Sequence, residues 1–444
     1  MNAAVPFLAH DRAGAVVAWG ADGAIDAGRF LREVRALAAL LPDRPSLANL
    51  CRDRYRFAVG FGAALLRGQL TLLPPDETSG LLERLAADFP GLYCLTDGGP
   101  PRAAGVAAFA YPGGLMDGPA APPPAIPAAQ PAAVLFTSGS TGEPRPHARS
   151  WGNLVRSARA AGSRLGVADL PGAAVVGTVP HQHSYGLEST VLLALQNGLA
   201  LGAGRPFYPA DVRASLAAAP RPRILVTTPI HLRAVLAEAG DPPSADLLIS
   251  ATAPLARSLA VAAEAGFRAP LREIYGCSEA GQLATRRTAL DEEWQCLPGV
   301  ELRQDAQGTW AAGPMVAGPT LLPDAIELRS AGRFLLSGRT ADLVNIAGKR
   351  TSLAYLDHQL NAVEGVCDGV FVMPRNEGEG VTRLIAFAVA PGLAPAAILA
   401  ALRQRIDAAF LPRPLLLVEA LPRTVVGKLP RAALLKLAVE RGAA

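Results

Sequence analysis

Cysteine is scarce in this chain of 444 residues, and the few cysteines are scattered. The five of them include no C-x-x-C pair and stand at Cys51, Cys94, Cys277, Cys296 and Cys367. An odd number at such spacing excludes a disulfide framework and a zinc site built on cysteine. Unpaired thiols also suit a reducing compartment, so we expect the protein in the cytoplasm.

Long apolar runs are missing as well. No stretch of about 18 consecutive apolar residues occurs, so we expect no membrane-spanning helix. The start, MNAAVPFLAHDRAG, lacks a basic segment ahead of an apolar one and therefore does not resemble a signal peptide. The net charge of +4 is too small to indicate a nucleic-acid partner.

Hydrophobic residues, by contrast, are plentiful. They make up 50% of the chain, whereas charged residues make up only 18%. This balance can build a large core, so we expect a folded chain and not a disordered one. At roughly 150 residues per domain, the length indicates two or three domains.

Short apolar runs alternate with helical patterns through the middle of the chain. We expect strands over 132–136, 173–179, 223–228, 246–250 and 271–275, and helices over 187–196, 229–239 and 255–265. This alternation predicts an α/β fold with βα units on parallel sheets. Ligands of such sheets bind at the carboxyl ends of the strands, so polar segments that follow a strand are candidate sites.

The pattern changes towards the carboxyl end. A Pro/Ala-rich stretch over 119–131 predicts a linker before the first core strand, and the residues ahead of it contain no motif. After Arg339 we expect strands over 371–373, 384–389 and 415–418 and a helix over 395–410, which indicate a small α+β domain. We therefore divide the chain into an N-terminal domain, 1–338, and a C-terminal domain, 339–444.

The strongest local signal is the segment TSGSTGEP, 137–144, which directly follows a predicted strand. Its four hydroxyls and two glycines let backbone N–H and side-chain O–H groups approach phosphate oxygens. A Walker loop would need a lysine after the second glycine, and a hydrolase elbow would need glycine where Ser138 stands. Taken alone, the segment is also compatible with a flexible turn.

Three further segments have side chains suited to chemistry. The pair His181 and His183 could suggest a metal, but no third ligand is near in sequence, so a binding-pocket or buried pair is favoured. The segment YGCSE, 275–279, offers a flat ring for a base, a hydroxyl for phosphate and a carboxylate for Mg²⁺. Lys428 follows a glycine, and its ammonium could neutralise carboxylate and phosphate charge together in a transition state.

In order and spacing, these segments resemble the motifs of the adenylate-forming (AMP-binding) superfamily, which includes acyl- and aryl-CoA synthetases. The similarity covers about residues 130–444 and rests on TSGSTGEP, YGCSE, SGRTAD with AGKR, and PRTVVGK. It implies a large N-terminal domain joined to a small, mobile C-terminal domain. It also implies that ATP and a carboxylic acid form acyl-AMP and pyrophosphate, after which a thiol displaces AMP.

The resemblance implies a nucleotide site assembled from distant segments. The first loop would hold the β- and γ-phosphates, with Arg145 where the family usually has lysine. Tyr275 and Gly276 would lie at the adenine, and Asp324 and Arg339 at the ribose. The complete nucleotide-binding set is Thr137, Ser138, Gly139, Ser140, Thr141, Gly142, Arg145, Tyr275, Gly276, Asp324 and Arg339.

The catalytic residues implied by the resemblance are Ser278, Glu279 and Lys428. Ser278 would reach the α-phosphate, Glu279 would hold Mg²⁺, and Lys428 would bridge the carboxylate and the α-phosphate. The C-terminal domain would then rotate about residues 340–342. Lys428 would leave, and Gly348 and Arg350 would approach the channel of the thiol.

The same resemblance implies an acid pocket made by His183, Tyr185, Ala251, Thr252, Gly276 and Cys277. Alanine and threonine in the SATAP loop, 250–254, narrow this acid pocket, which argues against a long fatty chain as the substrate. Short members with TSGSTGEP and HQHSYGLE look like ligases of aryl polyene and xanthomonadin-type pigment pathways, which implies a hydroxybenzoate-like acid. The acceptor would be coenzyme A or the phosphopantetheine of an acyl carrier protein.

Two alternatives remain open. Departures from the family pattern at Arg145, Pro323 and Ala341 allow a degenerate nucleotide-binding protein of the same fold, although Glu279 and Lys428 argue against it. The other alternative is an enzyme that forms acyl-AMP without a thiol step. Release of pyrophosphate and formation of a thioester distinguish these two alternatives from a thioester-forming ligase.

Overall fold

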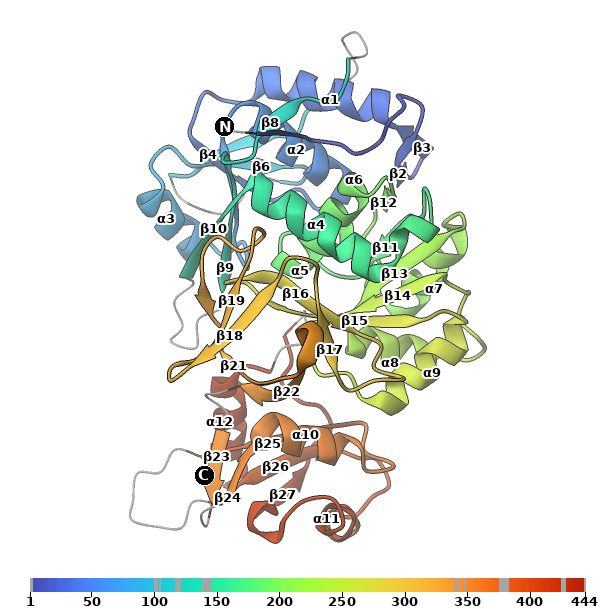
Figure 1. Cartoon of the computed structure of the whole chain (residues 1–444), viewed down its shortest axis with the longest axis vertical. Coiled ribbons are helices and arrows are strands. Elements are labelled where there is room, and N and C mark those ends of the chain that lie inside the picture. Colours follow the sequence, from blue (N-terminus) through green and yellow to red (C-terminus); the bar gives the residue numbers. More distant parts are fainter. Residues whose placement is uncertain are drawn as a thin grey trace.

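The computed structural model describes residues 3–99, 103, 105–115, 121–137, 145–339, 343–346, 349–374, 383–424 and 429–442. Two large sheets make up most of it, and a smaller α/β part formed by the last hundred or so residues lies beneath β21 and β22 in the view of Figure 1. Within the described residues, no helix combines the length and apolar character needed to cross a bilayer.

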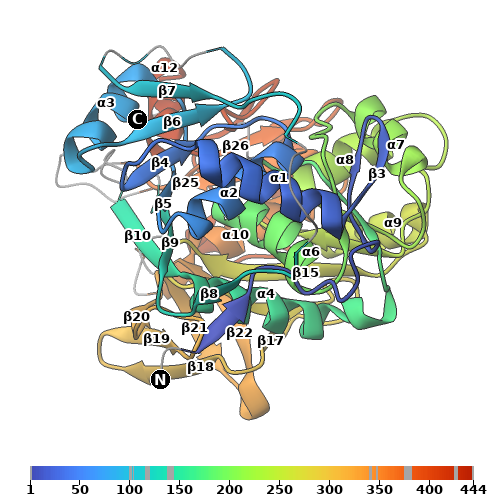
Figure 2. The same cartoon turned by 90° about the horizontal axis from the view of Figure 1, so that it is seen from above.

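The first large sheet has six strands in the order β10-β9-β5-β4-β6-β7. All neighbours are parallel except β9 and β10, which form an antiparallel pair. Helix α3 packs on one face and α2 on the other, with α1 beside α2 (Figure 2). The elements are α1 (Ala27–Leu40), β4 (Ser46–Asn49), α2 (Arg54–Leu66), β5 (Leu70–Leu73), α3 (Ser79–Asp88), β6 (Tyr93–Thr96), β7 (Ala107–Ala110), β9 (Pro131–Thr137) and β10 (Arg145–Ser150).

The second large sheet has eleven strands in the order β21-β22-β17-β16-β15-β14-β13-β11-β12-β2-β3. The run from β15 to β2 is parallel, which confirms the predicted βα units. Its strands are β2 (Val16–Gly20), β3 (Gly23–Asp26), β11 (Ala174–Gly177), β12 (Ala200–Gly202), β13 (Arg223–Thr227), β14 (Leu247–Ser250), β15 (Leu271–Cys277), β16 (Gly281–Arg286), β17 (Trp294–Cys296), β21 (Asp324–Leu328) and β22 (Arg333–Arg339).

Helices cover this second sheet on both faces. Helices α7, α8 and α9 lie together on one outer face in both views and bury a separate apolar cluster against β13 and β14 (Figures 1 and 2). The helices are α4 (Trp151–Leu165), α5 (Ser184–Gly186), a π-helical turn (Leu187–Leu192), α6 (Leu193–Gln196), α7 (Pro209–Ala218), α8 (Pro229–Ala237) and α9 (Arg257–Phe267). A small antiparallel sheet follows, made of β18 (Glu301–Asp305), β19 (Gly308–Ala312) and β20 (Thr320–Leu321).

The carboxyl-terminal part has apolar clusters of its own. Helices α10 and α11 bury one face of its three-stranded sheet, and α12 buries the other. Its elements are β23 (Leu343–Ile346), β24 (Lys349–Ser352), α10 (Leu353–Asn361), β25 (Asp368–Val372), β26 (Ile385–Val389), α11 (Pro395–Arg403), β27 (Leu415–Leu417) and α12 (Arg431–Glu440).

Two expectations about local structure were wrong. The helix expected over 395–410 ends at Arg403, because the Asp407 carboxylate accepts a hydrogen bond from the Ala409 N–H and starts a separate 3₁₀ turn there. The stretch expected as a linker over 119–131 contains β8 (Ala125–Pro127), which pairs with β1 (Ala4–Pro6).

The strands beyond β15 are antiparallel, so the second sheet is mixed and not purely parallel.

A buried arginine joins the two sheets on the amino-terminal side. Arg54, at the start of α2, is fully buried and donates hydrogen bonds to the carbonyls of Gly202, Gly204 and Gly177 at 2.7, 2.6 and 2.9 Å. These carbonyls lie at the ends of β11 and β12. The guanidinium therefore connects the start of α2 to the carboxyl ends of β11 and β12 in the second sheet.

We expect Arg54→Met to lower the free energy of unfolding by about 3 kcal/mol, because three carbonyls, one of them buried, lose their donor. Arg56→Met on the same helix is the control, since the Arg56 side chain is 50% exposed and its loss costs below about 1 kcal/mol. Urea denaturation followed by tryptophan fluorescence measures both. Equal effects of the two substitutions would contradict the role given to Arg54.

Candidate active site

The candidate acid-binding residues gather where neighbouring parallel strands end. Thr227, the last residue of β13, lies opposite Ser250, the last residue of β14. Ala251 and Thr252 follow β14 directly, and Cys277 is the last residue of β15, the strand that pairs with β14. Thr252 has a backbone φ of 79°, a left-handed conformation that is uncommon for a β-branched residue.

Tyr185 connects these strand ends. Its hydroxyl lies 3.0 Å from the Thr227 carbonyl and 3.1 Å from the Ile249 carbonyl. Burial raises the pKa of the Tyr185 hydroxyl well above its usual value, so the group stays neutral. The ring is thereby fixed against β13 and β14 and offers its apolar surface to the site.

Two glycines let the segment around Tyr185 and the β15–β16 hairpin pack closely against neighbouring backbone. A Cβ on Gly186, one residue after Tyr185, would collide with the Pro180 carbonyl. A Cβ on Gly276 would collide with the Gly281 carbonyl across the β15–β16 hairpin. Glycine at these two positions lets the loops fold tightly against the ends of the strands.

Tyr275 and Asp324, both expected at the nucleotide, are in contact. The Tyr275 hydroxyl donates to Asp324 Oδ2 at 2.7 Å, although the two residues are 49 positions apart. The Tyr275 ring is buried and packs near Trp294 and Phe334, with centroids 5.7 and 5.6 Å away. Asp324 lies opposite Arg339 in the β21–β22 register, so both expected ribose contacts come from one strand pair.

Arg149 joins the strand after the first loop to the segment that contains Ser278 and Glu279. This buried side chain of β10 donates from Nη2 to the Ser278 carbonyl at 2.6 Å. Burial lowers its pKa, and the charges of Glu188 and Glu279 oppose that shift. Arg145 lies opposite Thr137 at the start of the same hairpin.

The surroundings of the site contain groups that stay uncharged. Burial and the nearby Glu279 carboxylate raise the pKa of the Cys277 thiol to about 12, so the thiol is protonated at neutral pH. Burial also lowers the pKa of His181 to about 3, so its imidazole is neutral. The Cys277 and His181 side chains are therefore uncharged, whereas the Arg149 guanidinium contacts the segment that contains Glu279.

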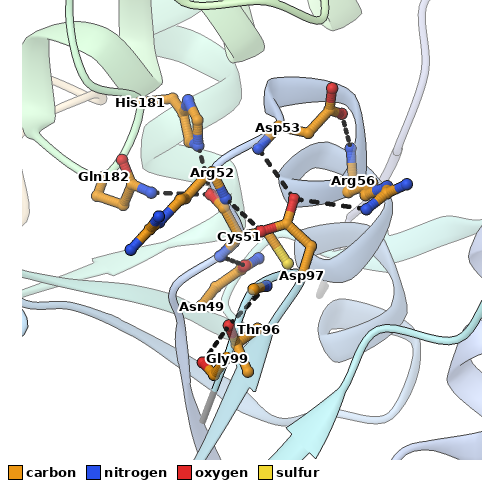
Figure 3. A network of polar contacts seen from close by, with 11 residues as sticks. Asn49, Cys51, Arg52, Asp53, Arg56, Thr96, Asp97, Gly99, His181 and Gln182 are labelled. Carbon is orange, nitrogen blue, oxygen red and sulfur yellow. Dashed lines mark hydrogen bonds and ion pairs between the residues drawn. The ribbon is translucent and has the colours of Figure 1, made fainter. Parts of the chain in front are cut away.

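Residues near position 50 hold the segment that contains the two histidines. His181 Nε2 and Gln182 Nε2 lie 2.8 and 2.9 Å from the Cys51 carbonyl, and Figure 3 shows both side chains directed at it. The carboxylate of Asp97 in turn accepts hydrogen bonds from the N–H groups of Arg52 and Asp53 at 2.8 and 3.0 Å. Of the two histidines, His181 thus has a structural partner, and His183 comes directly before α5.

The described residues contain no group of three histidines, cysteines or acids that could hold a metal ion. Glu279 nevertheless fits Mg²⁺ in one respect. Mg²⁺ usually keeps several waters and is bound through one or two carboxylates together with phosphates of the substrate. A single carboxylate such as that of Glu279 is compatible with a cation that arrives with ATP.

Several expected site residues lie outside the described part of the chain. They are Ser138, Gly139, Ser140, Thr141, Gly142, Gly348 and Lys428. For Thr137, Arg339 and Arg350 only the strand position is described, in β9, β22 and β24.

The sequence analysis missed three contributors: His147, Arg149 and the Cys51 carbonyl. His147 and Arg149 stand two apart on β10, and such spacing on a strand places both side chains on one face. The charges of both interact with Glu279. That spacing was the available signal, whereas nothing local distinguishes Cys51.

Comparison with known proteins agrees with this geometry. A family model described as AMP-binding enzyme matches residues 75–305, more than half of the chain. A 4-coumarate–CoA ligase of Rhodobacter capsulatus is 33% identical over 300 residues, which cover 67% of this chain and 74% of the relative. A 4-coumarate–CoA ligase of Halorhodospira halophila is 30% identical over 307 residues, with the same coverage.

A solved structure shows the same fold. ATP-bound MatB from Rhodopseudomonas palustris superposes with a TM-score of 0.83 at 19% identity and covers 96% of both chains. The fold class expected from the motifs is therefore confirmed. Together with the family model and the two ligases, this establishes that the chain belongs to the AMP-binding enzyme family and is an acid–thiol ligase.

Proposed function

We propose that this ATP-dependent ligase activates an aromatic, hydroxybenzoate-like carboxylic acid and transfers it to a thiol. The observation that carries the proposal is the cluster of neutral side chains at the ends of β13, β14 and β15, where Tyr185 is fixed and Cys277 is protonated. An aromatic ring suits such a wall. The acid in the names of both ligases, 4-coumarate, is a hydroxylated aryl acid.

In the first half-reaction, a carboxylate oxygen of the acid attacks the α-phosphorus of ATP, and the bond to pyrophosphate breaks. The segment Ser138–Gly142 holds the β- and γ-phosphates, and the Ser278 hydroxyl reaches the α-phosphate. Asp324 accepts hydrogen bonds from the ribose, with Tyr275 fixing its orientation at 2.7 Å. Glu279 holds Mg²⁺, which neutralises phosphate charge when it is bound.

In the second half-reaction, a thiol attacks the acyl carbonyl, AMP leaves with the bonding electrons, and the thiol proton passes to solvent. We assign this step to a rotated position of the C-terminal domain, 339–444, against the N-terminal domain, 1–338. Lys428 then withdraws, and Gly348 and Arg350 line the thiol channel. The thiol belongs to coenzyme A or to the phosphopantetheine of an acyl carrier protein.

The length of the acid is limited by the loop after β14. Thr252 keeps a side chain at a backbone conformation that favours glycine, and Ala251 beside it also retains a Cβ. Both occupy space that two glycines would leave open. This supports a compact aryl acid over a long fatty acid, as in the ligases of aryl polyene and xanthomonadin-type pigment pathways, and a cytoplasmic location suits the five free thiols.

A panel of acids tests the proposal. We expect pyrophosphate release with ATP and Mg²⁺ to be faster with 4-hydroxybenzoate or 4-coumarate than with octanoate. Coenzyme A or a carrier protein should then yield a thioester. A rate with octanoate equal to that with the aryl acids rejects the aryl substrate, absence of pyrophosphate with every acid indicates a degenerate protein, and pyrophosphate without a thioester indicates an acyl-AMP ligase.

Lys428→Ala is expected to slow acyl-AMP formation by at least about 100-fold, because a positive charge is lost where negative charge develops. Thiolysis of supplied acyl-AMP should stay within about two-fold of the wild-type rate. Lys436→Ala is the matched control, since Lys436 lies exposed on α12 and its ion pair among the described residues is with Glu440, one turn along the same helix. Equal loss of both half-reactions would exclude Lys428 from the specific role in adenylation.

Glu279→Gln is expected to raise the Mg²⁺ concentration needed for half-maximal pyrophosphate release by about ten-fold, because the amide keeps the shape of the side chain but not its charge. Glu238→Gln, an exposed position after α8, should leave the Mg²⁺ dependence unchanged. An unaltered dependence in Glu279→Gln would remove this carboxylate from the metal site.

A further inference from the structure

Five arginines from different elements line a cavity of about 370 Å³ away from the candidate active site. They are Arg164 at the end of α4, Arg272 in β15, Arg286 at the end of β16, Arg287 just after it, and Arg333 at the start of β22. Arg272 and Ser278 are six residues apart on an extended strand, which is roughly 20 Å. The cavity therefore lies near the opposite end of β15 from Ser278 and Glu279.

Three of these guanidiniums already have carboxylate partners. Arg287 binds Glu264 through two nitrogens at 2.9 and 2.8 Å. Arg286 donates to Glu273 at 2.8 Å and stacks over the Trp294 ring. Arg333 lies 3.4 and 3.3 Å from Asp291 and Glu293, which are the only acids in the cavity lining.

The other two guanidiniums have no acid partner within the described residues. Arg272 forms no side-chain hydrogen bond or ion pair there, although it is half-buried. Arg164 donates from Nη2 to the Cys296 carbonyl at 2.9 Å, but its buried Nε has no hydrogen-bond partner. Burial, followed by the charge of Arg287, lowers the pKa of Arg272; the charge of Glu264 opposes that shift, and the charge of Arg164 adds to it. Crowded positive charge of this kind costs free energy unless an anion offsets it.

We propose that this cavity is a second ligand site, which binds a compact anion with one or two phosphate groups, such as pyrophosphate or a phosphomonoester. Arg272 and Arg164 present N–H groups without acid partners, and a guanidinium fork matches phosphate oxygens well. The concave shape of the cavity suits a small anion better than the flat acidic surface of a protein.

The site adjoins the carboxyl-terminal part of the chain. Helix α10 lies against β22, whose first residue is Arg333 (Figure 1). His358 on α10 is close enough to Arg286 for that charge to lower its pKa, in addition to the larger effect of burial. A bound anion thus lies beside the face on which α10 packs.

Hydrogen exchange with added pyrophosphate or inorganic phosphate, without ATP, acid or Mg²⁺, tests the site. We expect slower exchange in peptides that cover 160–166 and 283–296. Arg272→Gln should weaken the pyrophosphate effect by at least about ten-fold, the loss of one charged hydrogen bond. Arg84→Gln, on the exposed side of α3, removes the same charge elsewhere and should change nothing.

Three results would overturn the site: no protection of these peptides at millimolar anion, protection confined to the strands that flank residues 138–144, or equal affinity in Arg272→Gln and the wild type. Unliganded Arg272→Gln should melt no lower than the wild type, because a repelled charge is removed. If that variant fails to fold, Arg164→Gln replaces it with the same expected loss of affinity. None of these readouts depends on turnover, so they are independent of the proposed ligase reaction.

Discussion

The contact between the Arg149 guanidinium and the Ser278 carbonyl is the interaction on which the candidate active site depends. Arg149 belongs to the six-stranded sheet and Ser278 follows a strand of the eleven-stranded sheet, so one partly buried hydrogen bond of 2.6 Å joins the two halves where the nucleotide is expected. A buried charge that lost its partner would be costly, which fixes the separation of the two sheets.

Charge is distributed unevenly around this junction. Burial keeps the Cys277 thiol protonated and the His181 imidazole uncharged. The charged Arg149 guanidinium, by contrast, contacts the segment that contains Glu279. Near the far end of the same strand, β15, five arginines that include Arg272 line a second polar region, which the proposed reaction does not require.

The first 130 residues contain no recognisable motif, but side chains and carbonyls near position 50 hold the segments that follow β11 and β12. Arg54 ties α2 to the carbonyls at the ends of β11 and β12, and the Cys51 carbonyl receives both His181 and Gln182 (Figure 3). These are contacts between a side chain and a backbone carbonyl. Any residue can supply the carbonyl, so such contacts leave no pattern in the sequence.

The sequence alone determined the βα units, their approximate bounds and the family, because apolar periodicity and glycine- or hydroxyl-rich loops are local properties. It also predicted that Tyr275 and Asp324 serve one nucleotide, and the structure places them in contact. Only the tertiary structure decided that Arg149 reaches Ser278, that His181 lies on Cys51, and that five arginines converge on one cavity. These contacts join residues far apart in the chain, and their formation depends on how the two sheets pack, which local composition does not specify.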